Sequence, residues 1–182
     1  MVTVAKKRAL EIKRSHVKMS KIIEGLYLCG ERAINEANIK QYNIKANVDL
    51  SKLRVVERKI KNNQNIDCLI IDVNDDPKQA AVLQRHCRRI FQFISYHLKK
   101  KNNVVVNCQA GISRSATVVI GYLMHTKKMS YDKAFNCVRR RRPIVNPNKG
   151  FSNMLKYTIN KKLSSTTMSL ATTAKIRDVK TK

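Results

Sequence analysis

The 182-residue chain lacks any apolar run that approaches the roughly 18 residues of a membrane-spanning helix. Its first twenty residues are positively charged, but they contain no apolar core of the kind that a secretory signal peptide needs. These two absences argue against a transmembrane segment and against a secretory signal. We therefore expect an intracellular protein of the cytoplasm, the nucleus or both.

Patterns typical of metal sites are also missing. The five cysteines form no Cys-x2-Cys pair and are odd in number, and the four histidines show no metal-site spacing. Acidic residues, which are other common metal ligands, are scarce. We expect no metal and no other cofactor, and thiols that stay reduced. Four cysteines are predicted to be buried, small apolar residues: Cys29, Cys68, Cys87 and Cys137.

The shortage of acidic residues leaves a formal net charge of +26 at pH 7. Charge of this sign favours acidic partners, so RNA or an anionic lipid surface is one interpretation. The other interpretation is a compositional bias spread over a solvated surface, and both stay open. The run Arg139–Arg142 is expected to be the solvated end of a helix. Its alternatives are docking of an acidic substrate loop and a nuclear address.

The composition divides the chain into three parts. Residues 1–20 are rich in lysine and arginine with few apolar residues between them, which predicts a basic N-terminal arm. Residues 21–161 carry periodic apolar patterns and are predicted to form one folded domain that holds the site. Residues 162–182 are rich in serine, threonine and lysine, which predicts a disordered tail.

Within the folded part, short strands alternate with helices. Apolar runs predict strands at 22–28 (with a turn at Glu24-Gly25), 44–50, 68–73 and 104–108. Helical spacing predicts helices at 31–41, 82–98, 116–127, 130–142 and 151–159, and polar residues 51–65 predict a surface segment. The alternation indicates an α/β fold with a single central, mostly parallel sheet flanked by helices.

The strand Val104–Cys108 leads into the most informative stretch. It ends on a cysteine, passes through a five-residue loop with a central glycine, and continues into a helix that begins near Arg114. Backbone N–H groups of such a loop and the helix N-terminus form an anion site that favours a cysteine thiolate. The arginine fork can hold two phosphate oxygens. The stretch predicts an enzyme that takes a phosphoryl group onto sulfur. The predicted phosphate-binding residues are Gln109, Ala110, Gly111, Ile112, Ser113 and Arg114.

Cys-x5-Arg-Ser after an apolar strand resembles the signature loop of the cysteine-based protein phosphatases, in particular the small dual-specificity type. The motifs Gly121-Tyr122-Leu123-Met124 and Asn146-Pro147-Asn148 also resemble that family in order and spacing. The resemblance covers about residues 21–160 and implies a phosphorylated protein as substrate. It implies removal of phosphate from phosphotyrosine and from phosphoserine or phosphothreonine through a phosphocysteine intermediate, without a cofactor.

The resemblance also implies residue roles. Cys108 would be the nucleophile, Arg114 would bind the phosphate, and Ser115 would donate a hydrogen bond to the departing sulfur. The family places its general acid on the loop after the preceding strand, which here offers Asp75 and Asp76. We favour Asp75 and keep Asp76 as the alternative acid.

One position departs from the family, which nearly always has a histidine before the nucleophile. This chain has Asn107, which carries no positive charge, so we expect a less stabilised thiolate and a slower first step. Two alternatives follow for the function. One is a phosphate-binding pseudo-phosphatase without turnover, and the other, suggested by the basic composition, is an RNA 5′-phosphatase.

Overall fold

The computed structural model of the chain describes residues 17–51 and 66–157. Most of the predicted basic arm (1–20), the polar segment (51–65) and the whole of the predicted tail (162–182) lie outside the described residues. No helix of the described part is long and apolar enough to cross a membrane. In the same part of the chain, no group of three or more His, Cys, Asp or Glu side chains could hold a metal ion.

A five-stranded sheet with the order β1-β2-β5-β3-β4 forms the centre of the molecule. Its strands are β1 (Ser20–Ile23), β2 (Leu26–Gly30), β3 (Ile44–Asp49), β4 (Asp67–Ile70) and β5 (Asn103–Cys108). The hairpin β1–β2 is antiparallel, whereas β2, β5, β3 and β4 pair in parallel. The predicted α/β class with a mostly parallel sheet is therefore confirmed, and β5 is its central strand.

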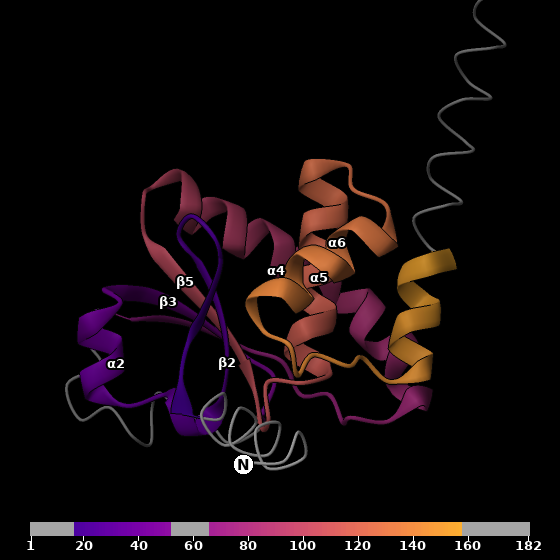
Figure 1. Cartoon of the computed structure of the whole chain (residues 1–182), viewed down its shortest axis with the longest axis horizontal. Helices are drawn as coiled ribbons and strands as arrows, with labels where there is room; N and C mark the ends of the chain where they lie inside the picture. The colour runs from indigo at the N-terminus through magenta and orange to yellow at the C-terminus, as the bar shows by residue number, and fades with distance from the viewer. Residues whose placement is uncertain (1–16, 52–65, 158–182) are drawn as a thin grey trace, which may run out of the picture.

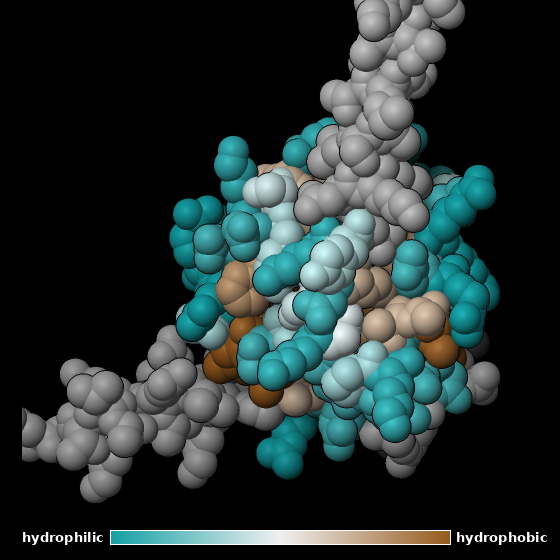
Figure 2. Space-filling model, turned by 90° about the vertical axis from the view of Figure 1, so that its right-hand side faces the viewer, coloured by the Kyte–Doolittle hydropathy of each residue, from teal (hydrophilic) through white to brown (hydrophobic). Residues whose placement is uncertain are grey.

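Helices cover both faces of this sheet (Figure 1). The elements are η1 (Glu31–Ala33), α2 (Glu36–Gln41), η2 (Pro77–Gln79), α4 (Ala80–Lys99), α5 (Arg114–Lys127), α6 (Tyr131–Arg141) and a helical segment at 149–157. The short α2 lies on one face, and α4, α5 and α6 lie on the other. The outer side of this helical layer is largely hydrophilic (Figure 2).

The three consecutive valines of β5, Val104–Val106, are buried on both faces of the sheet. Val104 and Val106 pack in the larger core, while Val105, which points the other way, packs in a smaller core with Tyr27 and Ile44. A strand buried on both faces needs apolar residues at successive positions, because side chains alternate between the faces. The strand that ends on Cys108 is thus fixed by packing from both sides.

Two predicted elements differ from the structure. The single helix expected at 31–41 is divided into η1 and α2, because Asn35 accepts a hydrogen bond from the N–H of Asn38 at 2.9 Å and starts a new helix. The strand expected at 68–73 ends at Ile70, and the chain then runs as a loop toward the end of β5. Cys29 is buried as predicted, but Cys68, Cys87 and Cys137 are only half-buried.

Candidate active site

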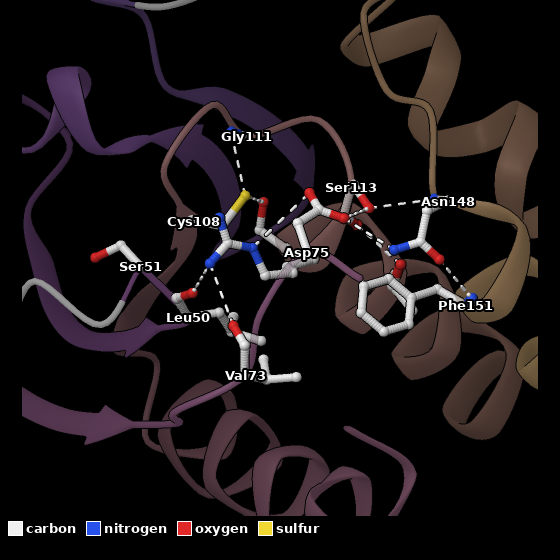
Figure 3. A network of polar contacts seen from close by, with 12 residues as sticks. Leu50, Ser51, Val73, Asp75, Cys108, Gly111, Ser113, Asn148 and Phe151 are labelled. Carbon is white, nitrogen blue, oxygen red and sulfur yellow. Dashed lines mark hydrogen bonds and ion pairs between the residues drawn. The ribbon is translucent and has the colours of Figure 1, made fainter. Parts of the chain in front are cut away.

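Cys108 ends β5, and the residue is 1% exposed at the base of the loop that leads into α5. The N–H of Gly111 donates a hydrogen bond to its Sγ at 3.3 Å, and the Ser115 hydroxyl lies 3.2 Å from the same atom (Figure 3). The sulfur is therefore flanked by two groups that stabilise negative charge on it. The structure brings together the predicted residues of this loop.

The backbone of the loop is oriented by its carbonyl groups. Four successive carbonyls accept hydrogen bonds from donors outside the loop: Gln109 from the N–H of Glu31, Ala110 and Gly111 from Arg142, and Ile112 from the N–H of Asn146. Because each peptide carbonyl and its N–H point in opposite directions, outward carbonyls leave N–H groups facing the concave side. This is the anion cradle that the sequence predicts.

Arg142 supplies two of these outer contacts. Its Nε donates to the Gly111 carbonyl at 2.7 Å and its Nη2 to the Ala110 carbonyl at 3.1 Å, and the residue is 1% exposed. The expectation of a solvated helix end is wrong for Arg142, although Arg139, Arg140 and Arg141 are exposed. Burial lowers the pKa of the Arg142 guanidinium. Composition gave no signal for this role, because the residue ends a run of four arginines.

Gly111 is required where the loop meets Arg142. Its φ of +68° is one that residues with a side chain rarely adopt. A Cβ atom at this position would lie 2.5 Å from the Cys29 carbonyl carbon and 2.6 Å from Arg142 Nη2. Any side chain would push the loop off its outer support.

Arg114 lies at the start of α5 with its guanidinium held from one side. Its Nη1 donates to the carbonyls of Leu50 at 2.8 Å and of Val73 at 3.2 Å. Its buried Nε makes no hydrogen bond within the described residues and lies 3.8 Å from Asp75 Oδ2. One end of the guanidinium is thus anchored, and its Nε faces the Asp75 carboxylate.

The two candidate acids are placed differently. Asp75 Oδ1 accepts hydrogen bonds from the Ser113 hydroxyl at 2.6 Å and from Asn148 Nδ2 at 2.9 Å, and its side chain is 37% exposed (Figure 3). Asp76 Oδ1 instead accepts from the N–H of Lys78 at 2.8 Å, where it caps η2. Asp75, and not Asp76, therefore lies beside Arg114.

Asn148 has a part in the site that the sequence analysis did not assign, although its motif was noted. Its N–H donates to the Ser113 hydroxyl at 3.2 Å, and its Oδ1 accepts from the N–H of Phe151 at 3.0 Å. It thus caps the helical segment 149–157 and binds the loop carrying Asp75. We call Asp75, Ser113 and Asn148 the rim network.

Asn107, the departure from the family pattern, belongs to a second set of polar residues on the opposite side of β5 from the Cys108 side chain. Asn107 Oδ1 accepts from Asn47 Nδ2 at 2.6 Å, and Asn107 Nδ2 donates to Asp49 Oδ1 at 3.0 Å. We call Asn47, Asp49 and Asn107 the floor network. Cys29 is fully buried, and burial raises the pKa of its thiol to about 12, so it is neutral near pH 7.

A family model described as "Dual specificity phosphatase, catalytic domain" matches residues 26–161. The chain belongs to the dual specificity phosphatase family. This confirms the family that the sequence analysis named. Family membership identifies the protein as a protein phosphatase, an enzyme that acts on phosphorylated proteins.

Similar proteins come from viruses and animals. Protein 123R of Invertebrate iridescent virus 6, named as a tyrosine phosphatase, is 36% identical over 136 residues, which cover 75% of this chain and 88% of the viral protein. Dual specificity protein phosphatase Mpk3 of Drosophila melanogaster is 35% identical over 136 residues, covering 74% of this chain and 32% of Mpk3.

Solved structures show the same fold as this phosphatase. The human tyrosine phosphatase-like serine/threonine/tyrosine-interacting protein matches with a TM-score of 0.70 and 29% identity, covering 81% of this chain and 99% of that one. The crystal structure of DUSP15 matches with a TM-score of 0.67 and 25% identity, covering 81% and 95%. The comparisons do not favour a pseudo-phosphatase or an RNA phosphatase over a protein phosphatase.

Proposed function

We propose that this phosphatase hydrolyses phosphotyrosine and phosphoserine or phosphothreonine in proteins through a phosphocysteine at Cys108. The observation that carries the proposal is the pairing of a nearly buried thiol with a guanidinium that is anchored at one end. The sulfur accepts a hydrogen bond from the N–H of Gly111, and Arg114 Nη1 is anchored while its Nε makes no hydrogen bond within the described residues. Residues 21–161 would form the catalytic domain, in keeping with the family match over 26–161.

In the first step, the Cys108 thiolate attacks phosphorus, forming the S–P bond as the P–O bond to the substrate side chain breaks. The loop N–H groups of residues 109–114 and the Arg114 fork bind the three equatorial oxygens as charge develops on them. Asp75, in its neutral form, gives its proton to the departing phenolate or alkoxide oxygen.

In the second step, water attacks the phosphocysteine and the S–P bond breaks. The Asp75 carboxylate takes a proton from the water, which restores the neutral acid for the next turnover. The Ser115 hydroxyl, 3.2 Å from Sγ, stabilises the departing thiolate with a hydrogen bond. Inorganic phosphate leaves, and the enzyme returns to its starting state.

The proposal favours Asp75 over Asp76 as the acid on the basis of the contacts. Asp75 Oδ2 lies 3.8 Å from Arg114 Nε, and Asp75 Oδ1 is bound to Ser113 of the phosphate loop. Asp76 caps the N-terminus of η2, and its carboxylate therefore points toward the Lys78 N–H. Only Asp75 would reach an oxygen bonded to phosphorus in the cradle without a change of the loop.

Hydrolysis of a small aryl phosphate by the purified full-length chain tests the function. We expect turnover that the Cys108→Ser variant loses by at least about a thousandfold, because the nucleophile is removed. Phosphotyrosine and phosphothreonine peptides, compared side by side, measure the dual specificity. Wild-type turnover no higher than that of Cys108→Ser, with phosphopeptide binding retained, would instead establish a pseudo-phosphatase.

We also infer a contact between the basic surface and a polyanion, with RNA as the probe and anionic lipid vesicles as the comparison. The net charge of +26 supports it. Binding of a single-stranded RNA should weaken steeply between about 50 and 200 mM salt. Release of phosphate from RNA 5′-triphosphate faster than from phosphopeptides would make RNA the substrate. If neither RNA nor anionic vesicles bind at low salt, the inferred contact is wrong and the charge reflects a compositional bias.

A further inference from the structure

We propose that Asp49 is a positioning residue that sets the orientation of Arg114 through the Leu50 carbonyl. Asp49 ends β3, whereas Arg114 begins α5, and the segment Leu50-Ser51 lies between them. This inference rests on the proposed function to the extent that Arg114 binds the phosphate.

The Asp49 side chain closes a turn at the end of β3. Asp49 is 1% exposed, and its Oδ1 accepts a hydrogen bond from the N–H of Ser51 at 2.7 Å. A carboxylate that accepts from the N–H two residues later closes an Asx-turn, which fixes the peptide units between them. The same Oδ1 accepts from Asn107 Nδ2 at 3.0 Å, so the turn is tied to β5.

Leu50 is held on both sides by hydrogen bonds of the backbone. Its N–H donates to the Asn107 carbonyl at 2.9 Å, which extends the β3–β5 pairing by one residue. The Asp49–Ser51 turn fixes the peptide unit on the other side of Leu50. The Leu50 carbonyl, held between these two contacts, accepts from Arg114 Nη1 at 2.8 Å (Figure 3).

The Leu50 carbonyl in turn orients Arg114. A guanidinium is planar and rigid, so a hydrogen bond at Nη1 determines the direction in which its other donors point. Anchored at Leu50 and Val73, the group keeps its Nε buried and free of a hydrogen bond within the described residues. A shift of the Leu50 carbonyl would rotate the Arg114 guanidinium away from the phosphate oxygens. The guanidinium would then lose its two parallel hydrogen bonds to the phosphate.

The conservative substitution Asp49→Asn is expected to be tolerated. Its amide oxygen can still accept from the Ser51 N–H and from Asn107, so the turn remains. Asp49→Ala removes the acceptor for both donors and releases the turn. A merely structural role would lower the stability of the fold without acting through Arg114.

A double-mutant cycle separates these outcomes, measured as binding of a phosphotyrosine peptide to the full chain carrying Cys108→Ser. In that background we expect Asp49→Ala to weaken binding about tenfold and Asp49→Asn to stay within about threefold. With Arg114→Ala also present, Asp49→Ala should change binding less than about twofold. Asp132→Ala, which removes an exposed carboxylate on α6, is the matched control and should have no effect.

The outcomes of this cycle distinguish a positioning role of Asp49 from a merely structural one. Equal losses from Asp49→Ala with and without Arg114 would overturn the positioning role. A loss from Asp49→Asn as large as that from Asp49→Ala would also overturn it, because charge and not the turn would then matter. Undiminished binding by Cys108→Ser/Arg114→Ala would refute the role of Arg114 in the proposed function instead. If Asp49→Ala does not fold, Asp49→Ser, whose shorter side chain cannot reach both donors, replaces it in the cycle.

Discussion

The rim and floor networks hold the Cys108 loop and its surroundings from two sides, and they differ in burial. In the floor network, Asn47, Asp49 and Asn107 are each at most 1% exposed. In the rim network Ser113 is buried, but the Asp75 side chain is 37% exposed and Asn148 is only half-buried. Each network contains a carboxylate that accepts hydrogen bonds from neutral donors.

Burial gives these similar bonds different consequences. A buried polar group that loses its partner has no water to replace it, so the floor bonds are costly to break. Rim bonds exchange with water at a small net cost, because the carboxylate is already partly solvated. The floor is therefore suited to fixing the end of β5, and the rim to releasing the Asp75 carboxyl when a substrate enters.

The largest expected effect within the rim comes from Asp75 itself. Asp75→Asn should lower kcat for phosphopeptides by roughly 10²–10⁴-fold, since it removes the proton donor for the leaving oxygen. The loss should be smaller for an aryl phosphate whose leaving group needs little protonation. Steady-state kinetics with both substrates measure this difference.

Asp76→Asn is the matched control for that comparison. It keeps an oxygen that can cap η2, so activity should stay within about twofold of the wild type and stability within about 1 kcal/mol. Equal small effects of the two substitutions would show that neither carboxyl is the acid. A large loss confined to Asp76→Asn would move the acid to the alternative residue.

The same contrast explains what the sequence could predict. The loop, its thiol and its arginine follow from a local pattern, a buried strand that enters a helix through a glycine-containing turn, and all of these residues meet in the structure. Arg142 and Asn148 reach the site from segments that follow α5, and their partners are backbone carbonyls and Asp75. Such contacts depend on tertiary packing, to which a run of arginines or an Asn-Pro-Asn turn gives no local clue.

The choice between Asp75 and Asp76 shows most directly what a sequence pattern cannot predict. Both residues follow the same strand and precede the same proline, so spacing leaves them equivalent. The structure separates them by the caps that they make, since Asp76 starts η2 and leaves Asp75 to face the phosphate loop. The turn geometry at Pro77 decides which of the two adjacent carboxylates points toward the phosphate loop. Residue propensities do not predict that geometry.

Two asparagines, one in each network, provide the finest test of the comparison. Asn107→Ala removes one buried hydrogen-bond partner from Asn47 Nδ2 and one from Asp49 Oδ1, and should destabilise the fold by about 2–4 kcal/mol. Asn148→Ala should cost only about 1 kcal/mol, yet lower kcat several-fold, because the loop carrying Asp75 loses one of its two donors. Denaturant unfolding and aryl phosphate kinetics on both variants measure the two quantities. Equal destabilisation by Asn148→Ala and Asn107→Ala would show that the rim bonds cost as much to break as the floor bonds. In that case a substrate could not release the Asp75 carboxyl at a small cost in free energy.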